Sequence, residues 1–367
     1  MIMENTELDW DSMRMEGDEL ADQIHSSLPA NAQEKKLVQL IMNSPNGTLT
    51  KEAACRMERI RHLFTKYFPF TGLILLCGSL PAAYSAAKGA ETLKCTGRMY
   101  EEPKVRILET TLFLHRIFEH QYYDHNLGRV CDLEKHPGFR AIAKVRLLHA
   151  RVRSHLKDLP KEVYNLDENG VPINQEDLLG TLHVFSYVVL HGLERLGFKI
   201  SDKDKDDFMH FWRQVGIWIG VSYKMQSFAQ EEANFRKIME RHSFPSNYSK
   251  AIVQQLFEKI SPPKCSVRQR QAISLYLKTL CWMLDEKLAR RLELEYSVYY
   301  KYKWYLYILL FKMYLVVDYI YQRFSRNGLS MFPVGEILGD VAATQMKALG
   351  VAQPFMFRVV VKPPPFS

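Results

Sequence analysis

Three residues on one predicted helix have the types and spacing needed to bind a haem. Arg146, His149 and Arg153 follow one another at intervals of three and four residues, which places them on one helix face. A neutral imidazole is a common axial ligand of haem iron, and flanking guanidiniums can pair with the haem propionates. The alternative is a basic surface helix whose histidine falls in the stripe by chance, because short spacing patterns recur often.

Further polar residues that could complete such a site lie on both sides of this helix. A helix predicted over 103–122 places Arg106, Glu109 and Thr110 on one face. Glu91 precedes that helix, and His183 follows the Asn-Gln-Glu-Asp segment at 174–177. These residues could supply a distal pocket and additional polar contacts.

The remaining histidines in the middle of the chain are weaker candidates for iron ligation. His191 is the best rival to His149 because it lies in an apolar, helical segment. The others are interpreted as surface or loop residues: His115, His120, His125, His136 and His155. A di-iron bundle is excluded because it requires Glu-x-x-His motifs, and the chain contains none.

The pattern of apolar residues predicts an all-α protein with one large domain. Apolar side chains recur at spacings of three and four, and no run of alternating residues indicates a sheet. The predicted helices cover residues 17–28, 32–43, 51–66, 103–122, 138–157, 176–196, 204–240, 247–259, 266–282, 284–295 and 298–325. We expect residues 1–60 to form a helical extension packed on the core, 61–340 the catalytic domain and 341–367 an extended tail.

The composition is that of an ordinary globular protein. The chain has 367 residues, 47% hydrophobic residues and a net charge of +8, without a Lys/Arg tract of the nucleic-acid-binding kind. Its 6 cysteines are scattered, which indicates free thiols in a reducing compartment. Since the amino terminus lacks a signal sequence, the expected location is the cytoplasm; no feature specifies an oligomeric state.

Two apolar stretches resemble membrane spans in length. Residues 67–87 are interrupted by Gly72, Gly78 and Pro81, and residues 304–321 contain Lys312 and Asp318. Because a spanning helix needs about twenty uninterrupted apolar residues, the second stretch is interpreted as a buried core helix. An interfacial helix with peripheral membrane contact is the alternative, because tyrosines and basic residues flank it.

Several short motifs, in the same order along residues 10–195, resemble one family. They are the Trp-to-Asp segment at 10–22, Gly-Ser-Leu-Pro-Ala at 78–82, Thr-Gly-Arg at 96–98, the arginine–threonine helix, Arg-x-x-His-Ala-x-Val-Arg at 146–153 and Asn-Gln-Glu-Asp-Leu-Leu-Gly-Thr at 174–181. The chain thus resembles the haem b-dependent oxygenases that include latex clearing protein (rubber oxygenase) and the fungal oxygenase of mycophenolic acid biosynthesis. The carboxy-terminal third resembles them only in being helical.

The resemblance implies a globin-like haem-binding core with additional helices, and a role for each candidate residue. His149 matches the proximal iron ligand, and Arg146 and Arg153 match arginines near the haem that pair with propionates. Arg106 and Thr110 match distal residues that can hydrogen-bond to bound dioxygen.

Two further residues are assigned by the same resemblance. Glu91 falls where the family has a glutamate that can act as a catalytic base, and His183 matches a polar position near the haem, as a second-sphere or propionate partner. Apolar residues of the same helices, Phe113, Leu114, Leu147, Leu148, Leu182, Phe185 and Val189, are candidates for the haem cage, although ordinary core packing explains them equally well.

One position departs from the family pattern. Where rubber oxygenase has a lysine that can cap the iron, this chain has Glu109, which cannot donate as a neutral amine does. The resemblance therefore implies an oxygenase that uses haem b and dioxygen on an apolar, isoprenoid-like substrate, with a distal site that differs from that of rubber oxygenase. The alternatives are a haem-binding or gas-sensing protein without turnover, and a cofactor-free helical scaffold that associates with membranes through residues 298–325.

Overall fold

The structure is a computed structural model of the chain. It describes residues 8–96, 103–259 and 282–294, together with the helical positions Val267, Tyr299, Tyr302, Tyr305, Leu306, Leu309 and Met313. The side chains of residues 65, 66, 68, 69, 103–106 and 259 are not among those described. The predicted helix over 266–282 lies mostly outside this part of the chain, and the predicted tail over 341–367 lies wholly outside it.

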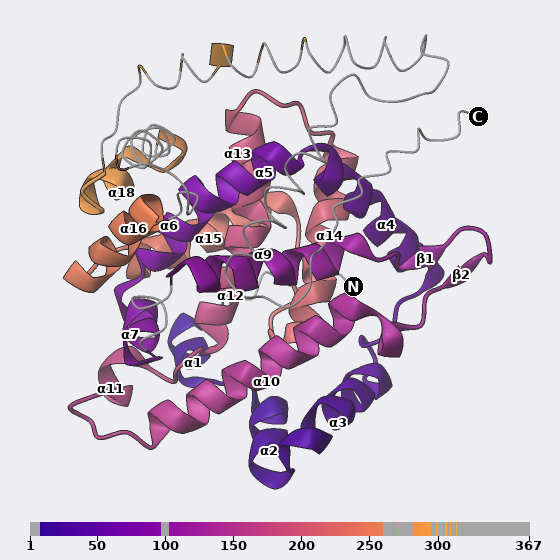
Figure 1. The fold of residues 1–367 in the computed structure, drawn as a ribbon, viewed down its shortest axis with the longest axis horizontal. Helices are drawn as coiled ribbons and strands as arrows, with labels where there is room; N and C mark the ends of the chain where they lie inside the picture. The colour runs from indigo at the N-terminus through magenta and orange to yellow at the C-terminus, as the bar shows by residue number, and fades with distance from the viewer. Residues whose placement is uncertain are drawn as a thin grey trace.

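The all-α prediction is confirmed, because in the described ranges helices are joined by loops and one short β-hairpin (Figure 1). In chain order the elements are α1 (Trp10–Met15), α2 (Glu19–Ser27), α3 (Ala30–Asn43), α4 (Lys51–Lys66), α5 (Phe68–Ile74), the π-helix η1 (Leu75–Ser79), α6 (Leu80–Tyr84), α7 (Ala87–Thr96), α9 (Pro103–Glu119), β1 (Tyr123–Asp124), β2 (Arg129–Val130), the short helix η2 (Leu133–Lys135), α10 (Pro137–Lys157), α11 (Leu166–Asn169), α12 (Gln175–Phe185), α13 (Tyr187–Arg195), α14 (Asp202–Ile219), α15 (Phe228–His242), α16 (Asn247–Lys259) and α18 (Glu286–Arg291). The boundary expected at residue 60 falls inside α4.

Two of the predicted helices were too long. The helix predicted over 204–240 is interrupted after Ile219, where Gly220 adopts a φ of 94° and ends α14. This left-handed conformation favours glycine and stops the helix, so α15 begins only at Phe228. The helix predicted over 176–196 is likewise divided at Ser186 into α12 and α13.

Helix α10 lies between α9 and the N-terminal helices α2 and α3. Figure 1 shows it crossing the lower half of the molecule, with α2 and α3 below it and α9 above. The approach of α9 is close: a Cβ atom on Gly138 would lie 2.7 Å from the carbonyl oxygen of Arg116 and 2.9 Å from Cα of Ile117. Since any larger residue would push the helices apart, Gly138 fixes their separation.

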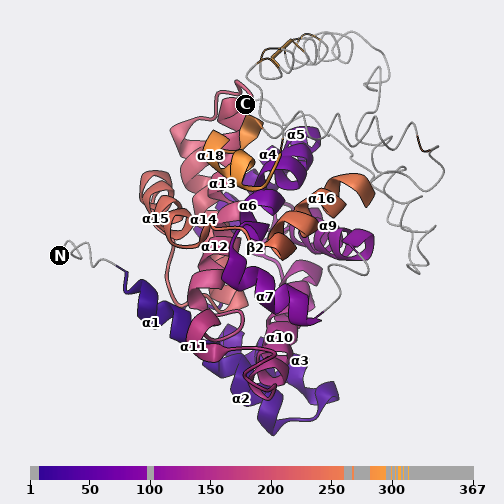
Figure 2. The same ribbon diagram turned by 90° about the vertical axis from the view of Figure 1, so that its left-hand side faces the viewer.

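The core is built around α12 and α14. Helix α12 packs against α1, α6, α13, α14 and α15, and α14 contributes the buried residues Phe208, Phe211, Trp212 and Trp218. Phe211 stacks on Phe118 of α9 with ring centroids 4.8 Å apart, which ties α9 to α14. Figure 2 shows α15 on one side of this core and α9 and α16 on the other.

Within the described residues, no single helix is both long and apolar enough to span a bilayer. Segments Phe70–Tyr84 and Ala87–Thr96 reach that length and composition only as a pair bent by 96°. The buried core helix predicted over 304–321 is not supported at its described positions, because Leu306, Leu309 and Met313 are each more than half exposed.

Helix α10 begins with a buried histidine that was predicted to lie at the surface or in a loop. Nδ1 of His136 accepts hydrogen bonds from the backbone N–H groups of Gly138 (3.1 Å) and Phe139 (3.3 Å), and Nε2 lies 3.3 Å from the carbonyl oxygen of His120. This arrangement requires a neutral imidazole with its proton on Nε2. The loop position agrees with the prediction, and the burial follows from tertiary structure, because Tyr122 covers the loop and its ring stacks on the imidazole.

We expect the stabilising effect of the His136 cap to be lost in acid. Burial lowers the pKa of His136 to about 4, below its ordinary value of 6.5. Because the unfolded chain binds this proton more readily, the contribution of His136 is complete above pH 6.5 and is lost as the pH falls towards 4, by at most about 3 kcal/mol. In urea titrations between pH 7 and pH 4, wild type should lose stability relative to His136→Asn, whose amide caps without titrating. Parallel pH profiles of the two proteins would contradict this assignment.

Candidate functional site

The candidate proximal residue and the candidate distal residue lie on two packed helices. Helices α9 and α10 are packed against each other, and Gly138 near the start of α10 lies against Ile117 near the end of α9, so the two helices run in opposite directions. His149 lies eleven residues along α10 from Gly138, and Thr110 and Arg106 lie seven and eleven residues before Ile117 on α9. His149, Thr110 and Glu109 are half-buried, and the side chain of Arg106 is outside the described part.

The two arginines that flank His149 are engaged by carboxylates of the N-terminal segment. Arg146 donates to both oxygens of Asp18, at 2.5 and 2.8 Å, and Arg153 donates to both oxygens of Asp22, at 2.8 and 3.0 Å. Both arginines are buried. The donors of both arginines that face the N-terminal helices are thus occupied by aspartates, whereas Nη2 of Arg153 is buried without a hydrogen-bond partner in the described part of the chain; propionate pairing stays a prediction.

Glu91 lies on α7, a helix that also packs against α10. Its carboxylate is partly exposed and pairs with Lys94 one helical turn away, at 3.0 Å. Since this pair is local and partly solvated, it holds Glu91 only weakly, and the carboxylate stays available for a proton-transfer role.

His183 is placed in a different part of the core. It is fully buried on α12, and its Nε2 lies 2.7 Å from Oε2 of Glu231 on α15. Burial alone would raise the pKa of Glu231, but its bonds to His183, Gln226 and Asn234 outweigh burial and lower it. Helix α12 packs mainly against α1, α6, α13, α14 and α15, and the expected place of His183 near the haem stays a prediction.

The rival ligand His191 is also remote from the α9–α10 pair. It lies half-buried on α13, where its ring stacks on Tyr187 with centroids 5.5 Å apart and burial lowers its pKa. Of the predicted cage residues, Phe113, Leu114, Leu147 and Leu148 lie on α9 or α10. Leu182, Phe185 and Val189 belong to α12 and α13 instead, and Phe185 stacks on Trp212 in the core.

Sequence reasoning missed a charged network that joins the motifs at 10–22 and 174–181 to α15. Arg14 of α1 pairs with Glu176 at 3.4 Å and with Asp177 at 3.0 Å, and Arg241 bridges Glu176 (2.8 Å) to Asp11 (2.7 Å). Burial alone would raise the pKa of Glu176, but His242 and Arg241 outweigh burial and lower it. The concentration of acidic residues in the 10–22 segment was the available signal, but a sequence does not show which cations they meet.

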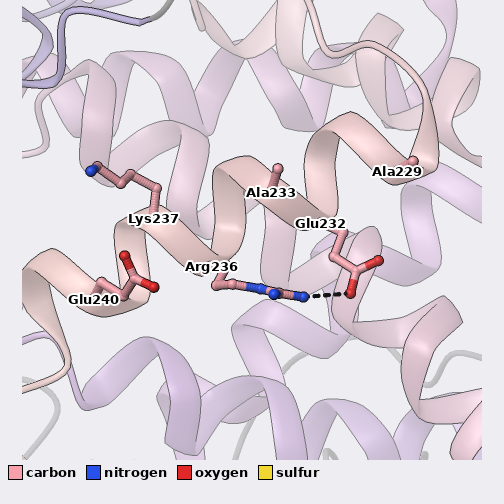
Figure 3. Close-up of a pocket in the computed structure, with 6 residues that line it drawn as sticks. All are labelled: Ala229, Glu232, Ala233, Arg236, Lys237 and Glu240. Carbon is pink, nitrogen blue, oxygen red and sulfur yellow. Dashed lines mark hydrogen bonds and ion pairs between the residues drawn. The ribbon is translucent and has the colours of Figure 1, made fainter.

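A surface depression on α15 is separate from all of these residues. It has a volume of about 360 Å³ and is lined by Ala229, Glu232, Ala233, Arg236, Lys237 and Glu240 (Figure 3). Arg236 and Glu232 pair along it at 3.0 Å, and Lys237 and Glu240 add one charge of each sign. All six residues lie on one face of α15, on successive turns. The depression is therefore a groove on the surface of a single helix, and we do not assign it to a cofactor.

The residues around His149 include a candidate iron ligand and the apolar side chains that a haem needs. The two arginines expected to pair with its propionates already pair with Asp18 and Asp22. A half-buried imidazole, a threonine hydroxyl and apolar side chains on two packed helices are the groups a haem requires. In the described ranges, no cluster of three or more His, Cys, Asp or Glu residues could hold a metal ion by itself. A single-histidine haem site needs no such cluster, since the porphyrin supplies the other ligands.

Comparison with known proteins identifies the same region. The family profile described as ER-bound oxygenase mpaB/B'/rubber oxygenase, catalytic domain, matches residues 70–311. The rubber oxygenase of Streptomyces sp. (strain K30) is 28% identical over 79 residues, which cover 22% of this chain and only 19% of that protein. The structure of latex clearing protein in the closed state superposes with a TM-score of 0.57 at 15% identity, covering 83% of this chain and 85% of that one, which shows a shared fold.

These matches confirm the resemblance inferred from the motifs and extend it. The profile continues to residue 311, so the expectation that the carboxy-terminal third shares only helical character was too narrow. The matched segment includes α9 and α10 and excludes the N-terminal helices α1 to α3.

Proposed function

Because this chain belongs to the mpaB/rubber oxygenase family, we propose that it is a haem b-dependent oxygenase that uses dioxygen to oxidise an apolar, isoprenoid-like substrate at a carbon–carbon double bond. The observation that carries the proposal is the catalytic-domain match over residues 70–311, which includes His149, Thr110 and Glu91. An apolar substrate suits a helical site walled by leucine and phenylalanine side chains.

His149 is the proposed iron ligand, and haem, when bound, supplies the iron centre that activates dioxygen. Support comes from the half-buried position of His149 on α10 and from the packing of α10 against α9, the helix that carries the half-buried Thr110. The hydroxyl of Thr110 and the guanidinium of Arg106 are proposed to donate hydrogen bonds on the distal side. Phe113, Leu114 and Leu147 would exclude water from that side and keep the site apolar.

Glu91 is the proposed carboxylate that removes a proton from the substrate or stabilises charge on it. Glu91→Gln should lower kcat by roughly a hundredfold, because general-base catalysis contributes about 10²–10⁴. The haem absorption spectrum should be unchanged. Product formation from polyisoprene and from short isoprenoid alkenes, measured by chromatography of carbonyl products, tests this prediction.

Lys94→Met is the matched control, because it breaks the same ion pair and leaves the carboxylate in place. Its kcat should stay within about threefold of wild type, since a partly exposed pair contributes little. Equal losses in the two variants would assign the effect to the ion pair, and unchanged turnover in Glu91→Gln would remove Glu91 from the mechanism.

A haem-binding or gas-sensing protein without turnover is the second candidate. The ion pair of Glu91 with Lys94 favours it, because in the structure the proposed base contacts an ammonium at 3.0 Å. A His149-dependent haem spectrum together with no product from any isoprenoid alkene would support the sensor and overturn the oxygenase proposal.

Peripheral contact with an anionic membrane through residues 298–325 is also proposed. Its described positions are helical, and all but one are 55–70% exposed, at alternating spacings of three and four: Tyr299, Tyr302, Leu306, Leu309 and Met313. The exception is Tyr305, which packs against Trp282. Basic residues in the same segment complement anionic lipid. The protein should co-sediment with phosphatidylserine-containing vesicles and several-fold less after Leu306→Asp with Leu309→Asp. Protein that stays in the supernatant with such vesicles would contradict membrane contact.

A further inference from the structure

We propose that Asp18 and Asp22 are positioning residues, which hold the turn of α10 that carries His149 through ion pairs with Arg146 and Arg153. The proposal rests on the proposed function, because it concerns the geometry of the iron ligand. It gives the N-terminal segment 10–22 a role in the site although that segment precedes the catalytic-domain match.

The first ion pair lies one turn before His149. The Asp18 carboxylate faces Arg146 side-on, and Nη1 of Arg146 also donates to the carbonyl oxygen of Trp218 at 3.2 Å. The side chains of Asp18 and Arg146 are only 4% and 8% exposed. Asp18 also caps α2, since its carboxylate accepts from the backbone N–H of Ala21. A shift of α10 would therefore break contacts to two other helices.

The second ion pair lies one turn after His149. Arg153 donates through Nε to both Asp22 oxygens, and its Nη1 donates to the carbonyl oxygen of Ile173 at 3.2 Å. Arg153 is fully buried, whereas Asp22 is partly exposed. The two pairs thus hold α10 on both sides of His149 along the helix.

A glycine lies against each ion pair and leaves no room for displacement. A Cβ on Gly220, whose φ is 94°, would lie 2.4 Å from Oδ2 of Asp18 and 2.7 Å from Nε of Arg146. A Cβ on Gly17 would lie 3.1 Å from Cδ of Arg153 and 3.2 Å from Oδ2 of Asp22. The backbone therefore encloses both pairs closely, and side-chain rotation cannot absorb a movement of α10.

The segment that carries the two aspartates is itself fixed to α12. The backbone N–H of Gln175 donates to the carbonyl oxygen of Glu16 at 2.9 Å, and its side-chain amide donates to the carbonyl oxygens of Gly17 (2.8 Å) and Gly220 (3.0 Å). Arg14 adds its pairs with Glu176 and Asp177. Asp18 and Asp22 are consequently rigid anchors for α10.

Buried ion pairs contribute little net stability compared with apolar packing, but they impose one geometry because an unpaired buried charge is costly. An iron ligand requires such a defined orientation, and loss of the groups that orient a ligating histidine commonly costs 10–100-fold in affinity. This reasoning separates a positioning role from a general contribution to folding.

The experiment uses the full chain with haem b, and Asp18→Asn, Asp22→Asn and Asp22→Glu are compared with Glu34→Gln. Glu34 of α3 is the matched control, because its carboxylate also pairs with α10, through Arg140 at 2.9 Å and Lys144 at 3.7 Å, but both of these basic side chains are more than half exposed. Three quantities are measured: the Kd for haem, the iron–histidine stretching band of the ferrous protein in resonance Raman spectra, and the thermal midpoint of the haem-free protein.

We expect Asp18→Asn and Asp22→Asn to raise the Kd for haem roughly tenfold and to shift the iron–histidine band. Asp22→Glu should restore both values, and Glu34→Gln should leave both unchanged. A wild-type Kd and band in both asparagine variants would overturn the proposal. The proposal would also be overturned if the Kd for haem changed in proportion to the thermal midpoint in all variants, including Glu34→Gln. If Asp18→Asn does not fold, the contrast between Asp22→Asn and Asp22→Glu decides.

Failure of the proposed function gives a different result. In that case wild type and His149→Ala would show the same haem spectrum, or no haem spectrum at all. A His149-dependent spectrum in wild type with no effect of the aspartate variants would instead leave the function intact and remove only the positioning role.

Discussion

Substitution of His149 by alanine is expected to remove the haem from the purified protein. The proposed site has one protein ligand to iron, so loss of its imidazole removes the axial bond while the apolar walls remain. The Soret band per mole of protein should fall to near background, and alkene oxidation should fall with it. Absorption spectra of wild type and variant, reconstituted with equal haem b, measure this directly.

Two companions make the result specific. His191→Ala should retain the wild-type spectrum, because His191 is stacked on Tyr187 of α13, away from the α9–α10 pair. His149→Gly should regain a Soret band when free imidazole is added, since the ligand is then supplied from solution. Retention of the band in His149→Ala and its loss in His191→Ala would reassign the ligand.

Substitution of Arg146 by methionine should be among the most destabilising changes in the chain. It leaves the Asp18 carboxylate buried without its cation, and breaking a buried pair in this way costs about 3–5 kcal/mol. The free energy of unfolding from urea titrations should fall by that amount. Adding Asp18→Asn to Arg146→Met should recover a large part of the loss, because the buried charge is then removed.

Arg140→Met is the control on the same helix. Arg140 pairs with Glu34 at 2.9 Å, but the arginine side chain is 52% exposed, so the loss should be below about 1 kcal/mol. Equal losses in the free energy of unfolding of the two single variants would show that the Arg146–Asp18 pair does not behave as a buried charge pair.

Much of the fold was predictable because it follows from local periodicity and caps. The predictions over 51–66 and 138–157 match α4 and α10 closely, since apolar spacing and helix-start residues act over a few neighbours. The predictions over 176–196 and 204–240 were too long. The apolar periodicity continues across Ser186 and Gly220, but the helical backbone conformation ends there. The left-handed φ of Gly220 is needed where the backbone passes the Asp18–Arg146 pair, and that contact is non-local.

The candidate site was predictable only in part. Order and spacing of the motifs identified the family and placed His149 and Thr110 on helices that do pack together. The same spacing suggested that Arg146 and Arg153 face a cofactor, whereas they meet Asp18 and Asp22. A guanidinium pairs equally well with a propionate or an aspartate, so its type and spacing cannot distinguish the two.

The sequence alone therefore determined the all-α class, the helix that carries Arg146, His149 and Arg153, and the family to which these residues point. Those conclusions depend on side-chain type and on spacing within a few turns, which a chain displays before it folds. Only the tertiary structure decided which carboxylate each arginine meets, that His183 pairs with Glu231, and that His136 caps α10 from a buried position. Such pairings join residues as far apart as Asp18 and Arg146, and their energy depends on burial, which no local pattern specifies.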